Sequence, residues 1–463
     1  MTRPGSHDGG RVVALSKLAL FSLAVGGAAC TPKVASQADN PDAAVTVQSA
    51  VVTRPATWLN LWGSWPFARY NHSMAYDSDR KLMVVYGGQQ GANGPYFDDT
   101  WEWDGARGLW NEKTPAPNGT TNTASPPVRT QQVMVYDTVQ KKMFMFSGWQ
   151  PQAGFFIPDQ WEWDGPSSTW KERVIAGAEP NPRYGATMVW DSDRNRAVLF
   201  GGFCSDNNTG ATARCNDVWE WDGTGTGTWT NRTPSSGTPP SPRMYHSAVY
   251  DSSRKKMVVF GGYTGTGAAT TGTSVDETWE WDGSTNPGVW TKVTPASGNS
   301  IAYYGSGIQL AYDAGRSKVV AYYYQQYMWE YDPTTPKWNA ITTTKTDPDQ
   351  PPYAAANGYN GGLVYDPDRK LIVDFGGYYG SNRELWELDG TAQTWANRST
   401  PTNGPIQRQY PSVAYDNMRG KLMLFGGYSN LDGLNKQDTW EWSGTDATWI
   451  NRTNANPKPP GRQ

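Results

Sequence analysis

Hydrophobic residues are grouped in short runs along most of this chain, and polar turns separate the runs. A typical stretch reads HSMAYDSDRKLMVVYGG, in which two apolar runs flank a tight basic turn. A second pair of runs follows as TWEWDG and LWNEKT, which flank a glycine turn. Runs of this length, rich in aromatic and β-branched residues, predict four short antiparallel strands in each such unit.

The unit is repeated seven times from about residue 66 onward. The aspartate that ends its first strand is Asp77, Asp137, Asp191, Asp251, Asp313, Asp366 and Asp416. An aromatic residue stands nine positions after each aspartate, at Tyr86, Phe146, Phe200, Phe260, Tyr322, Phe375 and Phe425. The landmark tryptophans that follow are Trp101, Trp161, Trp219, Trp279, Trp329, Trp386 and Trp440. Copies recur every 50 to 60 residues or so, a period typical of propellers and solenoids.

A sheet that is apolar on both faces must be covered on both sides, and radial packing of repeated sheets achieves this. We therefore predict an all-β fold, a seven-bladed β-propeller with four antiparallel strands per blade. The blades are expected at about residues 66–115, 127–175, 182–234, 242–295, 302–343, 352–400 and 407–454.

The repeat resembles the kelch repeat. The resemblance rests on the spaced tryptophans and on glycine pairs at Gly87–Gly88, Gly201–Gly202, Gly261–Gly262, Gly376–Gly377 and Gly426–Gly427. The second copy departs mildly, with Ser147–Gly148, and the fifth departs strongly. The resemblance implies a seven-bladed kelch-type propeller around a central channel, in agreement with the period.

Two segments compete to complete the last blade. TWLNLW at 57–62 and TWINRT at 448–453 both resemble an outermost strand. The second lies one short turn from its own blade, so its loop closes at a lower entropic cost. We expect residues 448–453, with Trp449, to form the strand.

Composition agrees with a β-protein, since the chain has 50 Gly, 33 Pro, 24 Trp and 25 Tyr residues. The formal net charge is −3, with both signs interspersed, so a nucleic-acid partner is not expected. No cofactor is predicted, and a monomer is expected.

The N-terminus has the pattern of an export signal, because Arg3, Arg11 and Lys17 precede the apolar run 18–30. The end of this run, GGAAC, resembles the lipobox of bacterial lipoproteins, and the resemblance implies lipidation at Cys30. Gly27 stands where that family usually has Leu. We expect a signal peptide at 1–29, a flexible tether at 30–54 and the propeller at 55–463. We therefore expect the protein to be located in the bacterial cell envelope, as an outer-membrane lipoprotein, or to be secreted. Any membrane contact would be made only through the lipid.

Cys204 and Cys215 are the remaining cysteines. In an exported chain a local disulfide is favoured, and closing so short a loop contributes about 3 kcal/mol. A zinc site is the weaker alternative, because two thiols without nearby histidines fall short of four ligands.

Strand-connection lengths predict that one face of the disc carries the loops. Connections between strands one and two, and between three and four, are short in every copy, whereas the other two connections are long and variable. All long loops therefore share one face, the long-loop face, where binding is expected. Its aromatic candidates include Trp149, Tyr263 and Tyr378, together with Tyr96, Phe97, Phe155, Phe156, Phe203, Tyr379 and Tyr428. The alternative is that these rings pack under their own loops.

An arginine precedes the innermost strand in five copies, at Arg69, Arg129, Arg183, Arg243 and Arg408. Five guanidinium groups around one axis could hold an anionic ligand. The alternative is a structural role, in which they pair with acids such as Glu102, Glu162, Glu220, Glu280 and Glu441.

The fifth copy has tyrosines at the glycine-pair positions and a very short loop, AYYYQQYMWEYD. One interpretation is a degenerate blade with a tight hairpin. The other is that the loop is short because its absence exposes the wall of a binding pocket. The wall would present Tyr303, Tyr304, Tyr323, Tyr324 and Tyr353.

No catalytic residue is predicted. His72 and His246 occupy the same place in the repeat, which marks them as framework. The favoured function is a non-catalytic scaffold that binds a protein or glycan through the long-loop face. The alternatives are a carbohydrate-active enzyme of the sugar mutarotase or epimerase type, with its site at the channel mouth, and a structural component of envelope assembly.

Overall fold

A computed structural model describes residues 66–453 of this protein, apart from 68, 91–94, 105–106, 108, 115–124, 151–153, 207–208, 266–271, 294–307, 324–326, 342–361, 376–384, 398–403, 407, 409–410 and 430. The described part of the chain consists of strands and turns. It contains no helix long and apolar enough to cross a membrane.

Seven four-stranded antiparallel sheets lie among these residues. Sheet 1 is β1 (Ser73–Asp77), β2 (Leu82–Tyr86), β3 (Thr100–Asp104) and β4 (Leu109–Thr114); sheet 2 is β5 (Val133–Asp137), β6 (Lys142–Phe146), β9 (Gln160–Asp164) and β10 (Thr169–Glu172). Sheet 3 is β12 (Thr187–Asp191), β13 (Arg196–Phe200), β16 (Val218–Asp222) and β17 (Thr228–Asn231); sheet 4 is β19 (Ser247–Asp251), β20 (Lys256–Phe260), β23 (Thr278–Asp282) and β24 (Val289–Val293). Sheet 5 is β25 (Gln309–Asp313), β26 (Lys318–Tyr323), β27 (Tyr327–Asp332) and β28 (Lys337–Ile341); sheet 6 is β29 (Gly362–Asp366), β30 (Leu371–Phe375), β31 (Leu385–Asp389) and β32 (Thr394–Asn397). Sheet 7 is β33 (Ser412–Asp416), β34 (Lys421–Phe425), β37 (Thr439–Ser443) and β38 (Thr448–Asn451).

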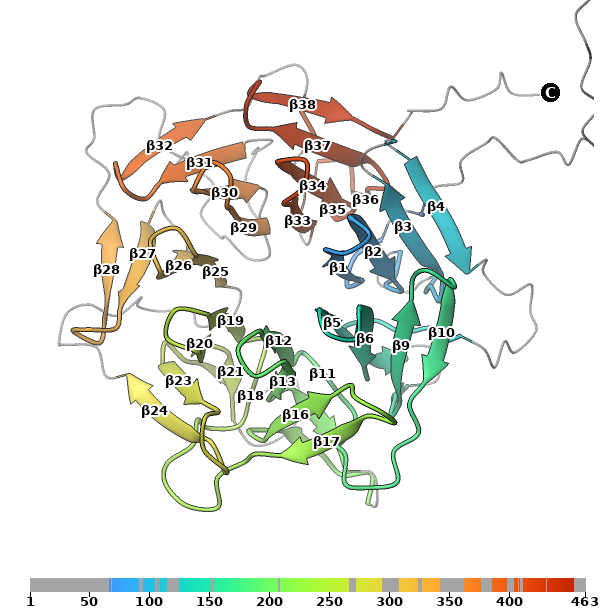
Figure 1. Ribbon diagram of the computed structural model, residues 1–463, viewed down its shortest axis with the longest axis vertical. Helices are drawn as coiled ribbons and strands as arrows, with labels where there is room; N and C mark the ends of the chain where they lie inside the picture. Colours follow the sequence, from blue (N-terminus) through green and yellow to red (C-terminus); the bar gives the residue numbers. More distant parts are fainter. Residues whose placement is uncertain are drawn as a thin grey trace, which may run out of the picture. The chain divides into compact units, whose positions relative to one another are not determined.

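The sheets are arranged as a ring, with the first strand of each at the centre and the fourth at the rim (Figure 1). The innermost strands contact one another in the cyclic order β1, β5, β12, β19, β25, β29, β33 and back to β1. This is a β-propeller, as the sequence predicts. The strand at 448–451 pairs with β37 and so completes sheet 7, which confirms the expected closing segment. Residues 57–62 lie outside the described residues.

Hydrophobic layers between neighbouring sheets form the core, and tryptophan N–H groups connect the same sheets. Met83, Val85 and Trp101 of sheet 1 pack against Met423 and Phe425 of sheet 7. At the rim of this interface, the indole N–H of Trp110 donates to the Thr439 hydroxyl at 2.5 Å. Equivalent bonds run from Trp170 to Thr100 and from Trp338 to Thr278, both at 2.6 Å. The ring is therefore closed by interactions of the same kind as those that join sheet 2 to sheet 1 and sheet 5 to sheet 4.

The aspartate at the end of each first strand organises the turn that follows. In sheet 1, Oδ1 of Asp77 accepts hydrogen bonds from the backbone N–H groups of Asp79 and Arg80. The Arg80 guanidinium then bridges Asp77 and Glu102, with N–O distances of 2.6 Å to each. Arg194, Arg254, Arg316, Arg369 and Arg419 make the same bridge in sheets 3 to 7.

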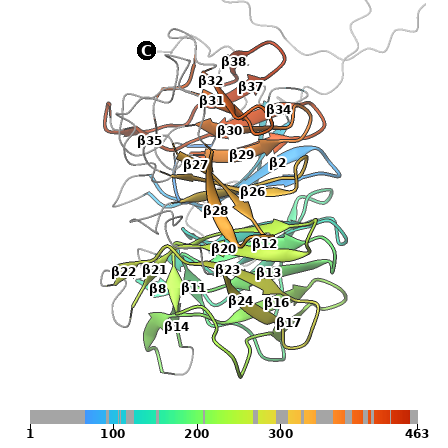
Figure 2. The same cartoon turned by 90° about the vertical axis from the view of Figure 1, so that its left-hand side faces the viewer.

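Small hairpins extend the long connections between second and third strands. They are β7 (Trp149–Gln150) with β8 (Phe155–Phe156), β14 (Phe203–Ser205) with β15 (Thr212–Arg214), β21 (Tyr263–Thr264) with β22 (Thr273–Ser274), and β35 (Tyr428–Ser429) with β36 (Leu434–Asn435). Two of them are joined by β11 (Arg183–Tyr184) and β18 (Arg243–Met244), which precede the innermost strands of sheets 3 and 4. In Figure 2, β8, β11, β14, β21 and β22 lie on the left, and the β16–β17 turn extends to the right. The long-loop face and the opposite turn face are thus distinct.

Each hairpin is entered through the glycine pair. Gly201 and Gly202 have φ values of +62° and +104°, which favour glycine, and a Cβ on Gly201 would lie 2.8 Å from the carbonyl oxygen of Arg243. In sheet 5, β26 instead continues through Tyr323, which pairs directly with Tyr327. The short connection expected in this copy is therefore present, and the pocket-wall interpretation stays a prediction, because its side chains lie outside the described residues.

Candidate functional site

Five aromatic side chains from three neighbouring repeats form a cluster on the long-loop face. This aromatic cluster consists of Trp149, Phe156, Tyr184, Phe203 and Tyr245. The ring centroids of Trp149 and Phe156 are 5.1 Å apart, and those of Phe156 and Tyr184 are 5.5 Å apart with nearly parallel planes. Tyr184 also lies 5.6 Å from Phe203 and 6.5 Å from Tyr245. The contacts are continuous, so the cluster is one surface.

Strand pairing places the cluster. Trp149 is opposite Phe156 in the β7–β8 hairpin, and Tyr184 of β11 is opposite Phe203 of β14. Phe203 is buried and forms the base, while Trp149, Phe156 and Tyr184 are half-buried. At the rim, Tyr245 is 43% exposed. The adjacent Phe155 is 46% exposed but is opposite Gln150, so it lies on the other face of this hairpin and is not part of the cluster. Ordered rings with exposed outer parts suit recognition of a partner, because little side-chain entropy remains to be lost on binding.

The other described aromatic candidates divide between the two sequence interpretations. Phe97 is buried, with the Arg69 guanidinium carbon 4.1 Å from its ring centroid, so it packs under its own loop. Tyr263 is half-buried and has Arg214 at 5.0 Å from its ring centroid. Tyr303, Tyr304, Tyr324, Tyr353 and Tyr378 lie outside the described residues, and only the backbone of Tyr323 is described.

The five repeated arginines are inside the protein. Each of Arg69, Arg129, Arg183, Arg243 and Arg408 is at most 1% exposed. Arg183 shows the common pattern: Nε donates to the carbonyl of Asn181, Nη1 to the carbonyl of Gly201, and Nη1 and Nη2 together hold the Asp217 carboxylate at 2.7 and 2.8 Å. These groups fasten the long-loop hairpin to the innermost segment. The geometry supports their structural role and presents none of the five guanidinium groups to solvent.

The acids that pair with these arginines differ from those expected. The partners are Asp99, Asp159, Asp217, Glu277 and Asp438, two residues before the landmark tryptophans. The predicted partners Glu102, Glu220, Glu280 and Glu441 instead bind the turn arginines, and Glu162 binds Arg173. The observed acid stands three positions before the expected glutamate, so the two side chains lie on opposite faces of the strand. The acid before the strand is also nearer the long-loop face, where the arginine lies.

Burial and the neighbouring positive charges shift the pKa values of these acids in opposite directions. Burial alone would raise the pKa of the Asp217 carboxyl, but the Arg183 charge and hydrogen bonds outweigh it and hold this pKa below its usual value. Burial likewise opposes the shift at Glu277, where Lys292 and Arg243 lower the pKa to about 2. Both carboxylates therefore remain ionised and paired at neutral pH.

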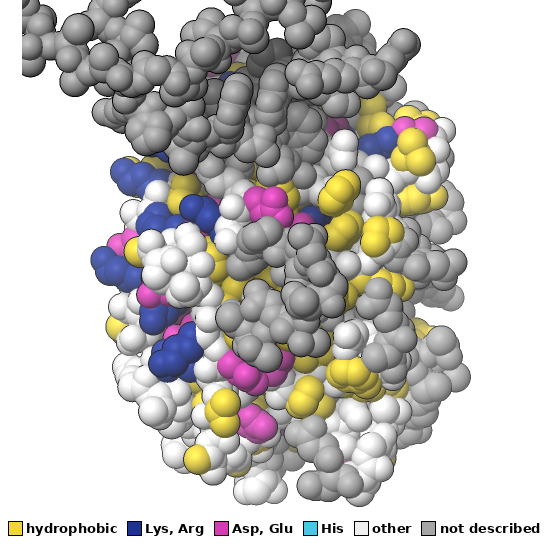
Figure 3. Space-filling view, turned by 90° about the vertical axis from the view of Figure 1, so that its right-hand side faces the viewer, with side chains coloured by type: hydrophobic (Ala, Val, Ile, Leu, Met, Phe, Trp, Pro, Cys, Tyr) yellow, Lys and Arg dark blue, Asp and Glu magenta, His cyan; other side chains and the backbone are white. Residues whose placement is uncertain are grey.

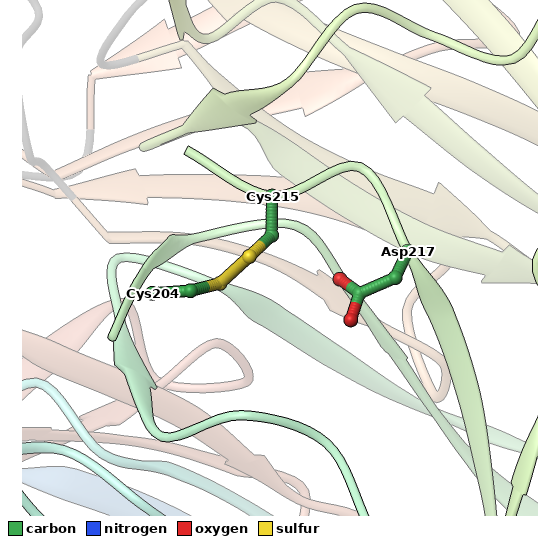
Figure 4. A group of neighbouring side chains, drawn as sticks. All are labelled: Cys204, Cys215 and Asp217. Carbon is green, nitrogen blue, oxygen red and sulfur yellow. A yellow bond between two sulfur atoms is a disulfide. The ribbon is translucent and has the colours of Figure 1, made fainter. Parts of the chain in front are cut away.

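Cys204 and Cys215 form a disulfide across the base of the β14–β15 hairpin, with Cα atoms 6.0 Å apart (Figure 4). The predicted disulfide is confirmed. The zinc alternative is contradicted, because both sulfur atoms are used in the bond and the nearby Asp217 is held by Arg183. The disulfide fixes the hairpin that supplies Phe203 to the aromatic cluster.

His72 and His246 lie between sheets, as their repeat position predicts. Nε2 of His72 is 2.6 Å from the Ser412 hydroxyl of sheet 7, and Nε2 of His246 is 2.8 Å from the Thr187 hydroxyl of sheet 3. Burial, with a smaller contribution from the neighbouring Arg69 or Arg243, lowers both pKa values to about 3. Each imidazole is neutral at pH 7, which suits a framework role; His246 is buried and His72 is half-buried.

A hollow that sequence analysis did not predict lies at the turn face. It has a volume of about 480 Å³ and is lined by Tyr76, Tyr312, Tyr365 and Tyr415, together with alanine and valine side chains of the innermost strands. These tyrosines precede the strand-ending aspartates, and that repeat position is the signal that could have found them. Their hydroxyls join neighbouring sheets, as in the 2.7 Å bond from Tyr76 to Asp416.

Similarity to known proteins agrees with this architecture. The family described as Attractin/LZTR1 beta-propeller matches residues 43–274, half of the chain. The chain belongs to this β-propeller family. The kelch resemblance of its repeats is also supported by Host cell factor 2 of Homo sapiens, which is 28% identical over 234 residues, 48% of this chain and 26% of that protein. Dynein regulatory complex subunit 7 of Chlamydomonas reinhardtii is 35% identical over 95 residues, 20% of this chain and 7% of that protein. This member of the Attractin/LZTR1 family thus spans about a quarter or less of the length of these two relatives.

Among solved structures, that of YjhT matches 84% of this chain and 98% of its own, with a TM-score of 0.46 and 13% sequence identity. The assignment to the Attractin/LZTR1 β-propeller family rests on the family match and on the arrangement of the sheets. Members of this fold share a scaffold, and the loops differ between them, so function must be argued from the site itself.

Proposed function

We propose that this propeller is a non-catalytic binding scaffold that engages a protein or glycan partner through the long-loop face. The observation that carries the proposal is the aromatic cluster, which three adjacent repeats build from different loops. The ordinary repeat supplies only the buried framework, so the cluster is an addition to it. Aromatic side chains are enriched where proteins bind their partners, because they combine a large apolar area with few rotatable bonds.

The two faces differ in character in a way that favours this surface. On the turn face, the exposed Lys141 and Lys255 form ion pairs with Asp79 and Asp193 of the preceding sheets. These charges are therefore paired within the protein. In Figure 3, Lys and Arg side chains gather toward the left edge, and hydrophobic side chains are more frequent toward the right. The long-loop face therefore offers the apolar contact area that a partner would bury.

The test compares variants at the cluster with a variant on the turn face. Trp149→Ala removes apolar area from the cluster, and Phe155→Ser removes an exposed ring beside it on the same face of the disc; these two are the cluster variants. Met418→Ser is the control and changes a side chain that is 55% exposed on the turn face. Partners are sought on a glycan array and in cell-envelope extract. We expect any ligand retained by the wild type and Met418→Ser to be lost or weakened at least tenfold by the cluster variants, with equal thermal stability. Equal retention by all three variants would exclude the long-loop face as the contact surface.

We further propose that the protein is exported and anchored by a lipid at Cys30, with the tether 30–54 leading to the propeller. Support comes from the lipobox-like GGAAC sequence and from the disulfide, which is typical of oxidising compartments. Labelling with a radioactive or alkyne fatty acid tests the site. Wild type is expected to incorporate the label and to appear in the membrane fraction, and Cys30→Ser to do neither. Labelling of Cys30→Ser at wild-type level would refute the assignment.

A further inference from the structure

Tyr245 has a backbone conformation that its residue type disfavours. Its φ is +55°, in the left-handed region, where a bulky aromatic residue is an outlier. The equivalent positions of the three preceding repeats are Asn71, Gln131 and Gly185, with φ values of +55°, +56° and +65°. Asn and Gly are the residues that this conformation favours. The fourth repeat thus keeps a tyrosine where the backbone favours a smaller residue, and such strain is commonly found at binding sites.

The neighbouring repeat accommodates the Tyr245 ring. A Cβ on Gly185 would lie 3.0 Å from Cε1 and 3.1 Å from Cδ1 of Tyr245, closer than side chains normally approach. The absence of a side chain at Gly185 therefore makes room for the ring, which rests over the third repeat. The backbone N–H of Tyr245 donates to the carbonyl of Gly185 at 2.8 Å, which fixes the same arrangement through the main chain.

The Tyr245 hydroxyl reaches further, to the second repeat. It donates to Oε1 of Gln131 at 3.1 Å. The backbone N–H of Gln131 in turn donates to the carbonyl of Asn71 at 3.0 Å. Asn71, Gln131, Gly185 and Tyr245 each stand two positions before an innermost strand, on the long-loop side. Tyr245 therefore extends from the fourth repeat to the second along the inner edge of the long-loop face, 43% exposed, beside Tyr184 of the aromatic cluster.

We propose that this part of the long-loop face binds a neutral sugar residue, which stacks on the Tyr245 ring and is hydrogen-bonded by the amides of Gln131 and Asn71. A pyranose ring presents an apolar C–H face and a rim of hydroxyls, and it needs a flat aromatic surface together with uncharged donors and acceptors. These are the groups placed here. The repeated arginines, which would favour an anionic ligand, are buried and paired with carboxylates. The inference rests on the proposed binding function and narrows it to a glycan.

Two substitutions separate the ring from the hydroxyl. Tyr245→Asn removes the stacking surface and installs the residue that the first repeat uses in the same conformation, so the fold is retained. Tyr245→Phe keeps the ring and removes the bond to Gln131. The probes are immobilised hexasaccharides of neutral sugars (cello-, xylo-, manno- and chitohexaose), with hexagalacturonate as the acidic comparator and thermal unfolding as the check on folding.

We expect the wild type to retain at least one neutral hexasaccharide and Tyr245→Phe to bind it within about threefold of wild type. Tyr245→Asn should lose at least about tenfold in affinity, the lower end of the effect of removing a ring on which a nucleic-acid base stacks. Unchanged binding by Tyr245→Asn overturns the inference, as does retention of hexagalacturonate alone or of no hexasaccharide. If a protein partner is still captured and is lost in Trp149→Ala, the long-loop face remains the binding surface and only the sugar assignment fails. If Trp149→Ala and Phe155→Ser leave all binding unchanged, the proposed function itself fails.

Discussion

Mild acid should destabilise this propeller through two histidines that lie between sheets. His72 and His246 have pKa values of about 3 in the folded protein, whereas an unfolded histidine titrates near its ordinary value of 6.5. Between these two values the unfolded chain binds more protons than the folded one, so the free energy of unfolding falls as the pH falls. The stabilising contribution is complete above pH 6.5 and is lost progressively below it.

The size of the effect follows from the two pKa values. At pH 5.0 an unfolded histidine is about 1.5 pH units below its pKa, while the folded one is still neutral. One pKa unit corresponds to about 1.4 kcal/mol, so each histidine costs about 2 kcal/mol and the pair about 4 kcal/mol relative to pH 7.5. Carboxylates contribute little above pH 5, because their unfolded pKa values are about 4.

The second repeat provides the matched control. Gln132 occupies the same position there, is buried, and donates from its amide to the carbonyl of Tyr86 at 2.8 Å. The double variant His72→Gln, His246→Gln therefore keeps a neutral hydrogen-bonding side chain at both interfaces. Urea unfolding at pH 7.5, 6.5, 5.5 and 5.0 measures the free energy of unfolding for both proteins. We expect the wild type to lose about 4 kcal/mol over this range and the double variant less than about 1 kcal/mol. Parallel curves for the two proteins would refute the argument.

Three further predictions concern the framework. Arg183→Ala should lower the free energy of unfolding by about 3 to 5 kcal/mol, because it leaves the Asp217 carboxylate without its buried partner. Arg196→Ala, which breaks a partly exposed pair, should lower it by less than about 1 kcal/mol. Equal losses in urea unfolding would contradict a buried structural role. Replacing both Cys204 and Cys215 by serine should lower stability by about 3 kcal/mol and make it insensitive to reductant, which a thermal scan with and without dithiothreitol checks. Tyr245→Asn should raise the free energy of unfolding by at most about 1 kcal/mol, since relief of the left-handed strain exceeds the loss of one exposed hydrogen bond; a clear loss of stability would show that the tyrosine is there for packing.

The repeat allowed the framework to be predicted from the sequence, because its residues recur at fixed intervals. Asp77, His246 and Trp449 take the places that their positions in the repeat indicate. The partners of the arginines were missed, although an acid two residues before the landmark tryptophan, such as Asp217, recurs in all five copies that have the arginine.

The aromatic cluster lies beyond such reasoning. Trp149, Tyr184 and Phe203 come from loops of different length and from different repeats, so no interval in the sequence predicts that their rings meet. Their contact depends on how each hairpin folds over the next sheet. The strain at Tyr245 is likewise invisible in the sequence, because a tyrosine is unusual there only once its backbone conformation is known.

The bond from Trp110 to Thr439 makes the first and last sheets neighbours like any others. Every sheet then has two partners, and none is terminal in the physical sense, although the chain has two ends. Unlike an open array of repeats, which can fray from its outer members, such a ring loses two interfaces when any one sheet unfolds. The set of interfaces between sheets therefore does not depend on which sheet comes first in the chain. A circular permutant, with new ends at a turn on the turn face and the old ends joined between sheets 7 and 1, would contain the same interfaces.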